Sequence, residues 1–505
     1  MAIITISRGS FVGGHELSQR LAEQLGLTCV TREELVARAV ADGVPVEQLE
    51  KAVARPSYTY TDMDRDRDLY LASITSQLTS KILEGSVIYE GHTGHMLLCG
   101  VPNILRIMVL AEPEFRVASV MRRLGLSREK ARAHIVQVDA DRDRWVKYLY
   151  GVDWRDPANY DVVIHLDQMG LNNATSVLCA MARLPEFVHT PGVDRSVASI
   201  HLGSKARFAL LSDSRTSRDG ISASGDDGVV QVICPPRHAE IIGHVRDVLS
   251  QVDGVREVYT TIADTRILVL QETFDCRARR FGELIRAAEK LDAAVELMRY
   301  DPRMAPHKPE DTLPQDPELT DVEELEARVH PPVTDLGSDI DSATFNILDE
   351  CLSDLRQHHR SAGSALFCGD TRMLATRLRR GGYSMVILGD LFLNRSESAR
   401  QRMRDELKSL LVERTGVPVV DASELERRLS FGGRQAGRLV LSLLISAALF
   451  GAVFMNQERM LTFLTNDSSN LWRSAAVAFV ALLTPVFAYA YGTFTGHLLE
   501  LFNLD

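Results

Sequence analysis

Residues 7–18, SRGSFVGGHELS, carry the clearest candidate chemistry in this 505-residue chain. Gly9 and Gly14 are separated by four residues, which is the spacing of a phosphate-binding P-loop. In such a loop, backbone N–H groups and a helix N-terminus cradle phosphates, a Lys neutralises them and a Ser or Thr holds Mg²⁺. Here His15 stands at the Lys position and Glu16 at the hydroxyl position. The segment therefore predicts a phosphate site with altered charges or, alternatively, a tight glycine turn.

The elements around this loop predict a parallel α/β sheet. The apolar run AIITIS ends at the loop, and ELSQRLAEQL then places Leu17, Leu21 and Leu25 at helical spacing. Later apolar runs, SVIYEG, ILRIMVLA and YDVVIHLD, alternate with amphipathic segments. Strands that alternate with helices indicate a parallel sheet, and ligands of such sheets bind at the carboxyl ends of the strands.

Four segments of residues 1–187 resemble the cytidylate kinase-like family, a branch of the P-loop nucleoside monophosphate kinases. They are ITISRGSFVGGHELSQRLAEQLG, VTREEL, EGHTGH and DADRDRWVKYLYGVDWRDPANYDVVIHLD. The resemblance implies a P-loop kinase-like fold, ATP with Mg²⁺ as possible cofactors, and transfer of the ATP γ-phosphoryl group to CMP. Where this family has DGRD, with an Arg on the substrate phosphate, the chain has Glu90, Gly91, His92 and Thr93.

The resemblance also implies the site residues. Arg142 and Arg144 match the lid arginines that close over the transferred phosphoryl group, and they are the candidate catalytic residues. The candidate cofactor-binding residues are Arg8, Gly9, Gly13, Gly14, His15 and His92. No metal site is predicted.

Each candidate keeps a plainer alternative. His15 is expected to be a partly exposed residue at a helix start rather than a phosphate ligand. Arg8 either approaches phosphate or caps local acids. Arg142 and Arg144 alternate with Asp139, Asp141 and Asp143, a pattern that is also typical of an exposed helix held by salt bridges.

Two further domains are predicted after the first. Residues 197–262 resemble a small α+β BON domain, on the DGVV turn and the VDGVREV ending. Residues 264–424 resemble a second α/β domain, that of universal stress proteins, interrupted by an insertion at residues 302–338 rich in proline and acid. In that family a glycine-spaced loop after VILG cradles phosphates, whereas here Asp390 follows Gly389 and would repel them.

The C-terminal residues 437–499 predict a transmembrane hairpin. LVLSLLISAALFGAVFMN and AAVAFVALLTPVFAYAYGTFTG carry no charge, and each is near the roughly 20 residues that cross a bilayer. Buried core helices are the alternative. Four arginines precede the first span, which by the positive-inside rule places the large N-terminal part in the cytoplasm, at the inner (cytoplasmic) membrane: Arg427, Arg428, Arg434 and Arg438.

Composition and charge limit the partners. The net charge of −11 argues against nucleic-acid binding. Nucleotide or phosphate, membrane lipid, and a membrane-protein partner or second copy remain the expected partners. The weakened phosphate contacts and the membrane segment favour a membrane-anchored regulatory or sensing protein with a degenerate kinase-like domain. An active cytidylate kinase and an accessory subunit of a membrane complex are the alternatives.

Overall fold

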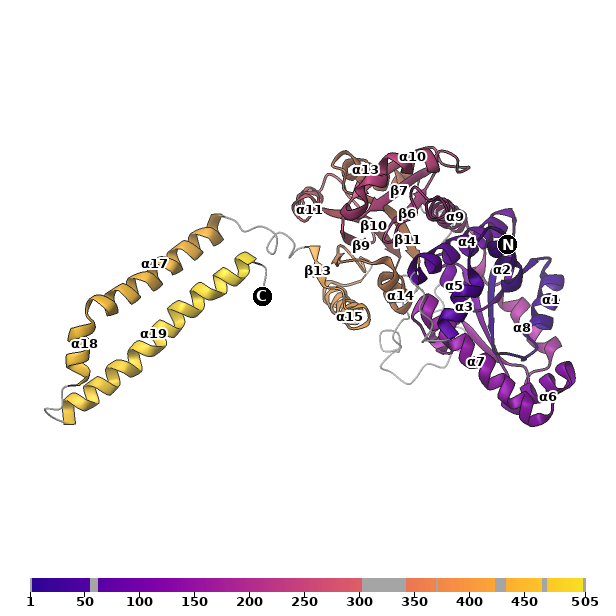
Figure 1. Cartoon of the computed structure of the whole chain (residues 1–505), viewed down its shortest axis with the longest axis horizontal. Helices are drawn as coiled ribbons and strands as arrows, with labels where there is room; N and C mark the ends of the chain where they lie inside the picture. The colour runs from indigo at the N-terminus through magenta and orange to yellow at the C-terminus, as the bar shows by residue number, and fades with distance from the viewer. Residues whose placement is uncertain are drawn as a thin grey trace, which may run out of the picture. The chain divides into compact units, whose positions relative to one another are not determined.

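The computed structural model describes residues 2–54, 62–301, 342–368, 371–393, 395–422, 433–465 and 470–502. The predicted insertion at residues 302–338 therefore lies outside the described residues. The chain divides into two compact units, Met1–Asp421 and Ala422–Asp505. Three sheets belong to the first unit, and a helical hairpin belongs to the second (Figure 1).

The first sheet confirms the predicted parallel α/β architecture. Its five strands are parallel and lie in the order β2-β3-β1-β4-β5. The strands are β1 (Ile3–Arg8), β2 (Thr28–Thr31), β3 (Val87–Gly91), β4 (Ile104–Leu110) and β5 (Val162–His165). The direction of winding reverses beside β1, and ligands of open parallel sheets bind at the carboxyl ends of strands at such a reversal.

Helices cover both faces of this sheet, and its central strands β3, β1 and β4 are accordingly buried along most of their length. One face packs on Leu17, Leu21 and Leu178, and the other on Tyr70 and Trp145. The helical elements are α1 (Gly14–Leu25), α2 (Arg32–Ala41), α3 (Val46–Ala54), α4 (Met63–Glu84), α5 (Gly94–Leu97), α6 (Pro113–Leu124), α7 (Arg128–Tyr150), η1 (Pro157–Asn159), α8 (Leu171–Met181) and η2 (Pro185–Phe187).

A small mixed sheet follows, in the order β6-β7-β8, with β6 and β7 antiparallel and β7 and β8 parallel. The long helix α9 packs on both α4 and β6, so it joins this sheet to the first one. The elements are α9 (Pro191–Ser212), β6 (Ser222–Asp226), β7 (Val229–Cys234), η3 (Pro236–Ile241), α10 (Ile242–Leu249) and β8 (Glu257–Ile262).

The third sheet is again fully parallel, in the order β11-β10-β9-β12-β13. Its winding reverses between β9 and β12. Thr261 Oγ1 donates to the carbonyl of Ser361 at 2.7 Å and so ties the small sheet to this one. The elements are β9 (Thr265–Gln271), α11 (Arg279–Lys290), β10 (Ala293–Asp301), α13 (Ser342–Gln357), β11 (Ser361–Cys368), α14 (Thr371–Gly381), β12 (Met385–Leu388), α15 (Glu397–Thr415) and β13 (Val419–Asp421).

The C-terminal unit is a hairpin of α17 (Gly433–Met455) and α19 (Asn470–Phe502), with α18 (Gln457–Leu464) between them (Figure 1). Ser446 Oγ donates to the carbonyl of Ala490 at 3.2 Å, and Phe450 packs edge-on against Phe487. Gly437–Met455 and Val477–Thr495 are long and apolar enough, by length and composition, to cross a membrane. Large apolar side chains on both helices are exposed, as Phe454 and Leu482 illustrate.

Candidate functional site at the loop after the first strand

The first loop, residues 9–13, connects β1 to α1 at the reversal point of the first sheet. The Gly9 amide donates to the Val109 carbonyl at 3.0 Å and fixes the start of the loop. Gly13 has a φ of 87°, a conformation that favours glycine, and it is the N-cap of α1. A side chain at Gly14 would collide with the stem of Arg8. Gly13 is therefore favoured by its backbone conformation, and Gly14 by the close approach of Arg8.

Glu90, at the end of β3, organises the charges beside this loop. Its carboxylate is only 2 % exposed and accepts from Arg8 Nε at 2.7 Å. The same carboxylate contacts His15 Nδ1 at 2.8 Å, and His15 Nε2 contacts Gln19 at 3.0 Å. His15 thus lies beside the loop but is held by a carboxylate rather than presented freely. Arg8 is an ion-pair partner of Glu90 and lies against Gly14.

Arg142 reaches the loop from the middle of α7. Its side chain is buried, Nη1 donates to the Arg8 carbonyl at 2.5 Å, and the guanidinium lies 5.6 Å from the Trp154 ring. Its Nε atom is buried without a hydrogen-bond partner. Burial, followed by repulsion from Arg8, lowers the pKa of Arg142 to about 9. Both causes are offset when an anion lies beside the guanidinium.

His92 adds a second unpartnered nitrogen to the same place. Its Nδ1 atom is buried and has no hydrogen-bond partner. Burial lowers the pKa of His92 well below 6.5, and the charges of Arg142, Arg32 and Arg8 lower it further. A neutral His92 keeps one ring N–H that can donate to a phosphate oxygen.

Two predicted or neighbouring residues point elsewhere. Arg144 is two residues from Arg142 but lies on the exposed side of α7, where it pairs with Asp141. Glu16 pairs with Arg20 at 3.0 Å and is 57 % exposed, so its carboxylate is directed away from the loop. The structure brings Arg8, His15, His92 and Arg142 together at the loop and leaves Arg144 outside the group.

A polar network under the loop escaped the sequence analysis. Arg116 Nη2 contacts both carboxylate oxygens of Asp139, at 2.7 and 2.9 Å, and donates to Ser10 Oγ at 2.5 Å. Ser10 Oγ in turn donates to Asp139 at 2.5 Å. Arg116 and Asp139 follow Ser10 by 106 and 129 residues, so only the folded structure reveals the grouping. These hydrogen bonds hold Ser10, and with it the start of the first loop, in place.

The residues fit a phosphate group but not a P-loop Mg²⁺ site. The buried donors of Arg142 and His92 and the glycine cradle suit phosphate oxygens. Neither nearby oxygen group is placed to bind Mg²⁺. The Glu16 carboxylate pairs with Arg20, and the Ser10 hydroxyl is hydrogen-bonded to Arg116 and Asp139. No step through Mg²⁺ is therefore derived.

The second loop, residues 389–393, occupies the equivalent reversal point of the third sheet but is closed by the chain itself. The carboxylate of Glu272, just after β9, accepts from the Phe392 amide and from the Leu393 amide at 3.4 Å. The Gln271 side chain fills the space over Gly389. Asp390, which the sequence predicted would repel phosphate, lies 3.7 Å from Arg280. An internal carboxylate thus takes the amides that a phosphate would need.

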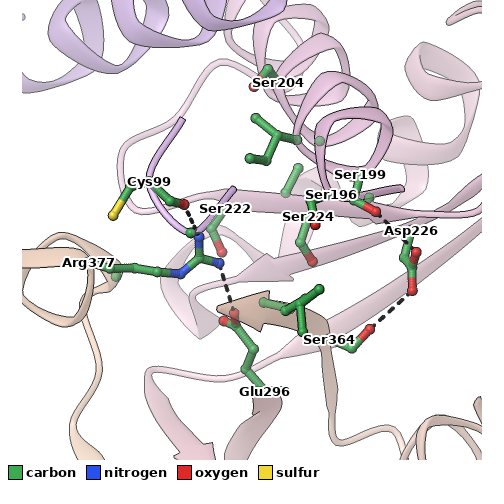
Figure 2. Close-up of a pocket in the computed structure, with 18 of the residues that line it drawn as sticks. Cys99, Ser196, Ser199, Ser204, Ser222, Ser224, Asp226, Glu296, Ser364 and Arg377 are labelled. Atoms are coloured by element: carbon green, nitrogen blue, oxygen red, sulfur yellow. Dashed lines mark hydrogen bonds and ion pairs between the residues drawn. The ribbon is translucent and has the colours of Figure 1, made fainter. Parts of the chain in front are cut away.

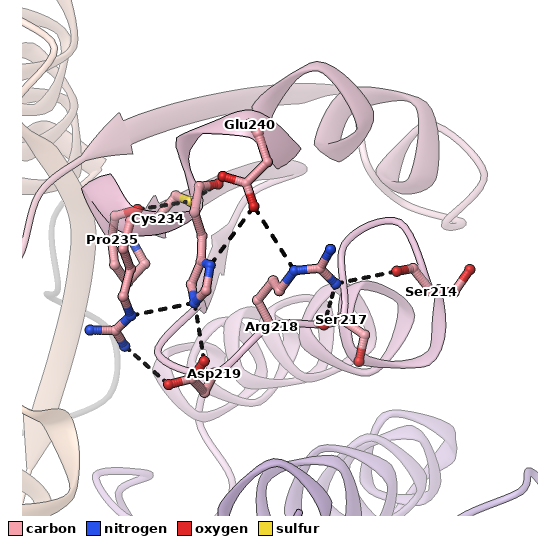
Figure 3. A network of polar contacts seen from close by, with 9 residues as sticks. Ser214, Ser217, Arg218, Asp219, Cys234, Pro235 and Glu240 are labelled. Carbon is pink, nitrogen blue, oxygen red and sulfur yellow. Dashed lines mark hydrogen bonds and ion pairs between the residues drawn. The ribbon is translucent and has the colours of Figure 1, made fainter.

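A Cys, His and Asp grouping in the small sheet does not form a nucleophilic site (Figure 3). The His238 ring contacts Asp219 at 3.1 Å and Glu240 at 3.9 Å. The Cys234 thiol donates to the His238 carbonyl at 3.2 Å rather than to the ring. Burial raises the pKa of Cys234 to about 11, so the reactive thiolate is disfavoured.

The comparison with known proteins concerns the part of the chain that carries the first loop. Residues 3–168 match the Cytidylate kinase-like family. The cytidylate kinase of Methanopyrus kandleri is 27% identical over 187 residues, 35% of this chain and 91% of that protein. The cytidylate kinase of Ignicoccus hospitalis is 25% identical over 172 residues, 34% of this chain and 92% of that protein.

Among solved structures, an uncharacterized protein from Eubacterium ventriosum ATCC 27560 is 20% identical. That similarity covers 36% of this chain and 97% of the other, with a TM-score of 0.29. Residues 3–168, the part of this chain that matches the family, include the first loop, His92, Arg142 and Arg144. The sequence prediction of a cytidylate kinase-like segment at the N-terminus is therefore confirmed.

Proposed function

We propose that the N-terminal cytidylate kinase-like segment binds a nucleotide through its phosphates, and that the chain is a membrane-anchored regulatory or sensing protein. One observation carries the binding proposal: Arg142 Nε and His92 Nδ1 are both buried without partners beside the first loop. Buried donors without acceptors are costly, so sites that keep them commonly receive an acceptor from a ligand.

Each residue has a distinct role in this binding. The backbone of residues 9–13 and the start of α1 cradle the phosphate, and the helix dipole favours its charge. Arg142 and Arg8 supply positive charge, while His92 donates one hydrogen bond. Glu90 holds Arg8 in place against Gly14 and keeps His15 at the helix start.

Binding without efficient phosphoryl transfer is favoured by the charges at positions 15 and 16. The Lys of a working loop neutralises the β and γ phosphates, whereas His15 is bound to Glu90. The hydroxyl that holds Mg²⁺ in a working loop is replaced by Glu16, which pairs with Arg20. Loss of one preorganised electrostatic contact costs roughly 2.7–4 kcal/mol of transition-state stabilisation.

The C-terminal hairpin is proposed to anchor the chain in the inner (cytoplasmic) membrane, with the N-terminal unit in the cytoplasm. Two helices of sufficient length with exposed apolar side chains support an anchor. The BON-like and universal stress protein-like segments are proposed to pass the state of the nucleotide site to partners. Small residues such as Gly451 and Gly492 also permit close packing on other membrane helices, which suits an accessory subunit or a homo-oligomer.

An active cytidylate kinase is the second candidate, and the family match over residues 3–168 favours it. In that reaction a phosphate oxygen of CMP attacks the γ-phosphorus of ATP, and the bond to the β-γ bridging oxygen breaks to release ADP. CMP-dependent ADP formation by the purified chain would establish this candidate over the binding protein.

Two arginines of one helix test the binding proposal. We expect Arg142→Gln to weaken CDP or ATP binding by roughly tenfold or more, since one charge-assisted contact is lost. Arg144→Gln is the matched control, because Arg144 pairs with Asp141 on the exposed face, and we expect a change within about twofold. Calorimetric titration of the full chain in detergent measures both. Equal affinities for the two variants, or no nucleotide binding by the unmodified chain, would overturn the proposal.

A further inference from the structure

A cavity of about 340 Å³ lies within the N-terminal unit, where α4 and α5 meet α9 and strands of the second and third sheets. Its wall combines α5 and the residues just after it, α9 with β6, and strands β9 to β11 with α14 (Figure 2). The volume is at the lower end of the range for small-molecule sites. The cavity is separate from the first loop, since none of residues 9–13 lines it.

The wall carries more positive than negative groups. Five arginines line it, against two carboxylates, those of Asp226 and Glu296: Arg195, Arg207, Arg266, Arg299 and Arg377. Serine hydroxyls from α9, β6 and β11 face the same space, as Ser204, Ser222 and Ser364 show in Figure 2. Guanidinium and hydroxyl donors together are the usual partners of phosphate oxygens.

Neither carboxylate is available to neutralise the excess. Asp226 accepts from Ser199 at 3.1 Å and from Ser364 at 3.2 Å, and it pairs with Arg195 at 3.3 Å. The second carboxylate, Glu296, is equally occupied: Tyr383 donates to it at 2.8 Å, Arg266 pairs with it at 3.1 Å and Arg377 lies at 3.8 Å.

Arg207 pairs with Asp68 at 2.7 Å, which leaves Arg299 as the lining arginine without an ion pair among the described residues. Within the described residues, its Nη1 atom is the one terminal guanidinium nitrogen that is buried without a hydrogen-bond partner. Arg377, which also lines the cavity, donates to the Cys99 carbonyl at 3.1 Å but has a buried Nε without a partner. A buried guanidinium nitrogen without an acceptor is unfavourable, and a bound anion removes that cost.

We propose that this cavity is a second ligand site, which takes a small molecule bearing phosphate or a comparable polyanionic group. Arg299 and Arg377 bind the anionic oxygens, and Ser222 and Ser204 donate to the remaining ones. The proposal does not depend on nucleotide binding at the first loop.

The position of the site connects it to the first loop. Met96, Leu97 and Cys99 line the cavity, and they follow His92 in the chain by only a few residues. A ligand that draws Arg377 away from the Cys99 carbonyl therefore acts on the segment that presents His92. Occupancy of the cavity is expected to change nucleotide affinity at the first loop.

The test uses inorganic pyrophosphate as the probe and the full chain in detergent, with Arg142→Gln present throughout to weaken the first loop. We expect saturable calorimetric binding, weakened by roughly tenfold when Arg299→Gln is added. Arg256→Gln is the matched control, because Arg256 is exposed and pairs with Asp227, and it should leave binding unchanged. Arg299→Lys, which keeps the charge, should retain part of the affinity.

A second variant guards against misfolding. Ser222→Leu fills the cavity and leaves every arginine in place, so it should abolish pyrophosphate binding while thermal unfolding stays cooperative. The proposal is overturned if the Arg142→Gln chain does not bind pyrophosphate at about 10 mM. It is also overturned if Arg299→Gln or Ser222→Leu binds as tightly as that chain. Neither result bears on Arg142 and nucleotides, so the two proposals fail separately.

Discussion

The first loop and the second loop each follow a strand beside the winding reversal of a parallel sheet, yet their charges are arranged in opposite ways. At the first loop, the carboxylate of Glu90 binds side chains, Arg8 and His15, and Arg142 Nε stays without a partner and can donate to an external anion. At the second loop, the carboxylate of Glu272 binds the loop amides directly. Glu90 therefore leaves room for a phosphate at the first loop, whereas Glu272 takes the place of a phosphate at the second.

This difference shows that loop position in a parallel sheet does not by itself make a ligand site. Both loops follow a strand at a winding reversal, where ligands of such sheets usually bind. What separates them is which donors remain unpaired after folding. The comparison can be tested by altering the acids, the pH and the glycines of the two loops.

The largest effect is expected from the two acids. Glu90→Gln should lower the free energy of unfolding by about 3 kcal/mol, because it removes the charge from a buried ion pair. The same change should tighten nucleotide binding, since Arg8 then lacks a competing anion while the Gln amide oxygen can still accept its hydrogen bond. Glu272→Gln should cost only about 1 kcal/mol, because the amide oxygen still accepts from the loop.

Urea unfolding and calorimetric titration of both variants check these values. Equal destabilisation by Glu90→Gln and Glu272→Gln, or weaker nucleotide binding by Glu90→Gln, would contradict the roles assigned to the two acids.

A smaller effect is expected from pH, through the buried histidines that follow β3. Burial lowers the pKa of His95 from 6.5 to about 3. Between these values the unfolded chain takes up a proton that the folded chain does not, so stability is lost as pH falls below about 6.5. At pH 5 this amounts to about 2 kcal/mol for His95.

Replacement of His95 by Phe should remove this part of the pH dependence. The ring packs edge-on against Tyr160 at 5.1 Å and neither nitrogen has a hydrogen-bond partner, so Phe fits without losing a bond. Urea midpoints at pH 7.5 and pH 5 measure the difference. An unchanged pH dependence in His95→Phe would show that other groups cause it.

The smallest effect is expected from the two glycines. Gly14→Ala should weaken nucleotide binding by roughly tenfold, because the new methyl group displaces the Arg8 stem from its place beside Glu90. Gly389→Ala places its methyl group against Gln271 and should leave nucleotide binding unchanged. Titration of the two variants side by side decides the matter, and a loss of affinity in Gly389→Ala would assign nucleotide binding to the second loop.

Much of the architecture was predictable because it depends on local pattern. Continuous apolar runs alternating with amphipathic segments specify buried parallel strands and their covering helices. The glycine spacing at Gly9 and Gly14 predicted the turn from β1 into α1, and the uncharged runs near the C-terminus predicted two long apolar helices. These signals lie within short stretches of chain, so no knowledge of distant contacts is needed to read them.

The candidate site was predictable only in outline, as two residues of α7 show. Arg142 and Arg144 fit the family motif equally well, but residues two apart on a helix point in different directions. Tertiary packing places Arg142 against the first loop and Arg144 in water beside Asp141. No local pattern distinguishes the two.

By itself, the sequence determined the order of strands and helices, the glycine turn, the cytidylate kinase-like resemblance and the apolar hairpin. Each of these depends on residues that are close together in the chain. Only the tertiary structure decided which donors stay unpaired. Glu90 meets Arg8 across 82 residues, and Glu272 meets the Phe392 amide across 120. Charges separated so far along the chain become partners only when the sheet brings strand ends together, and that pairing decides where an anion can bind.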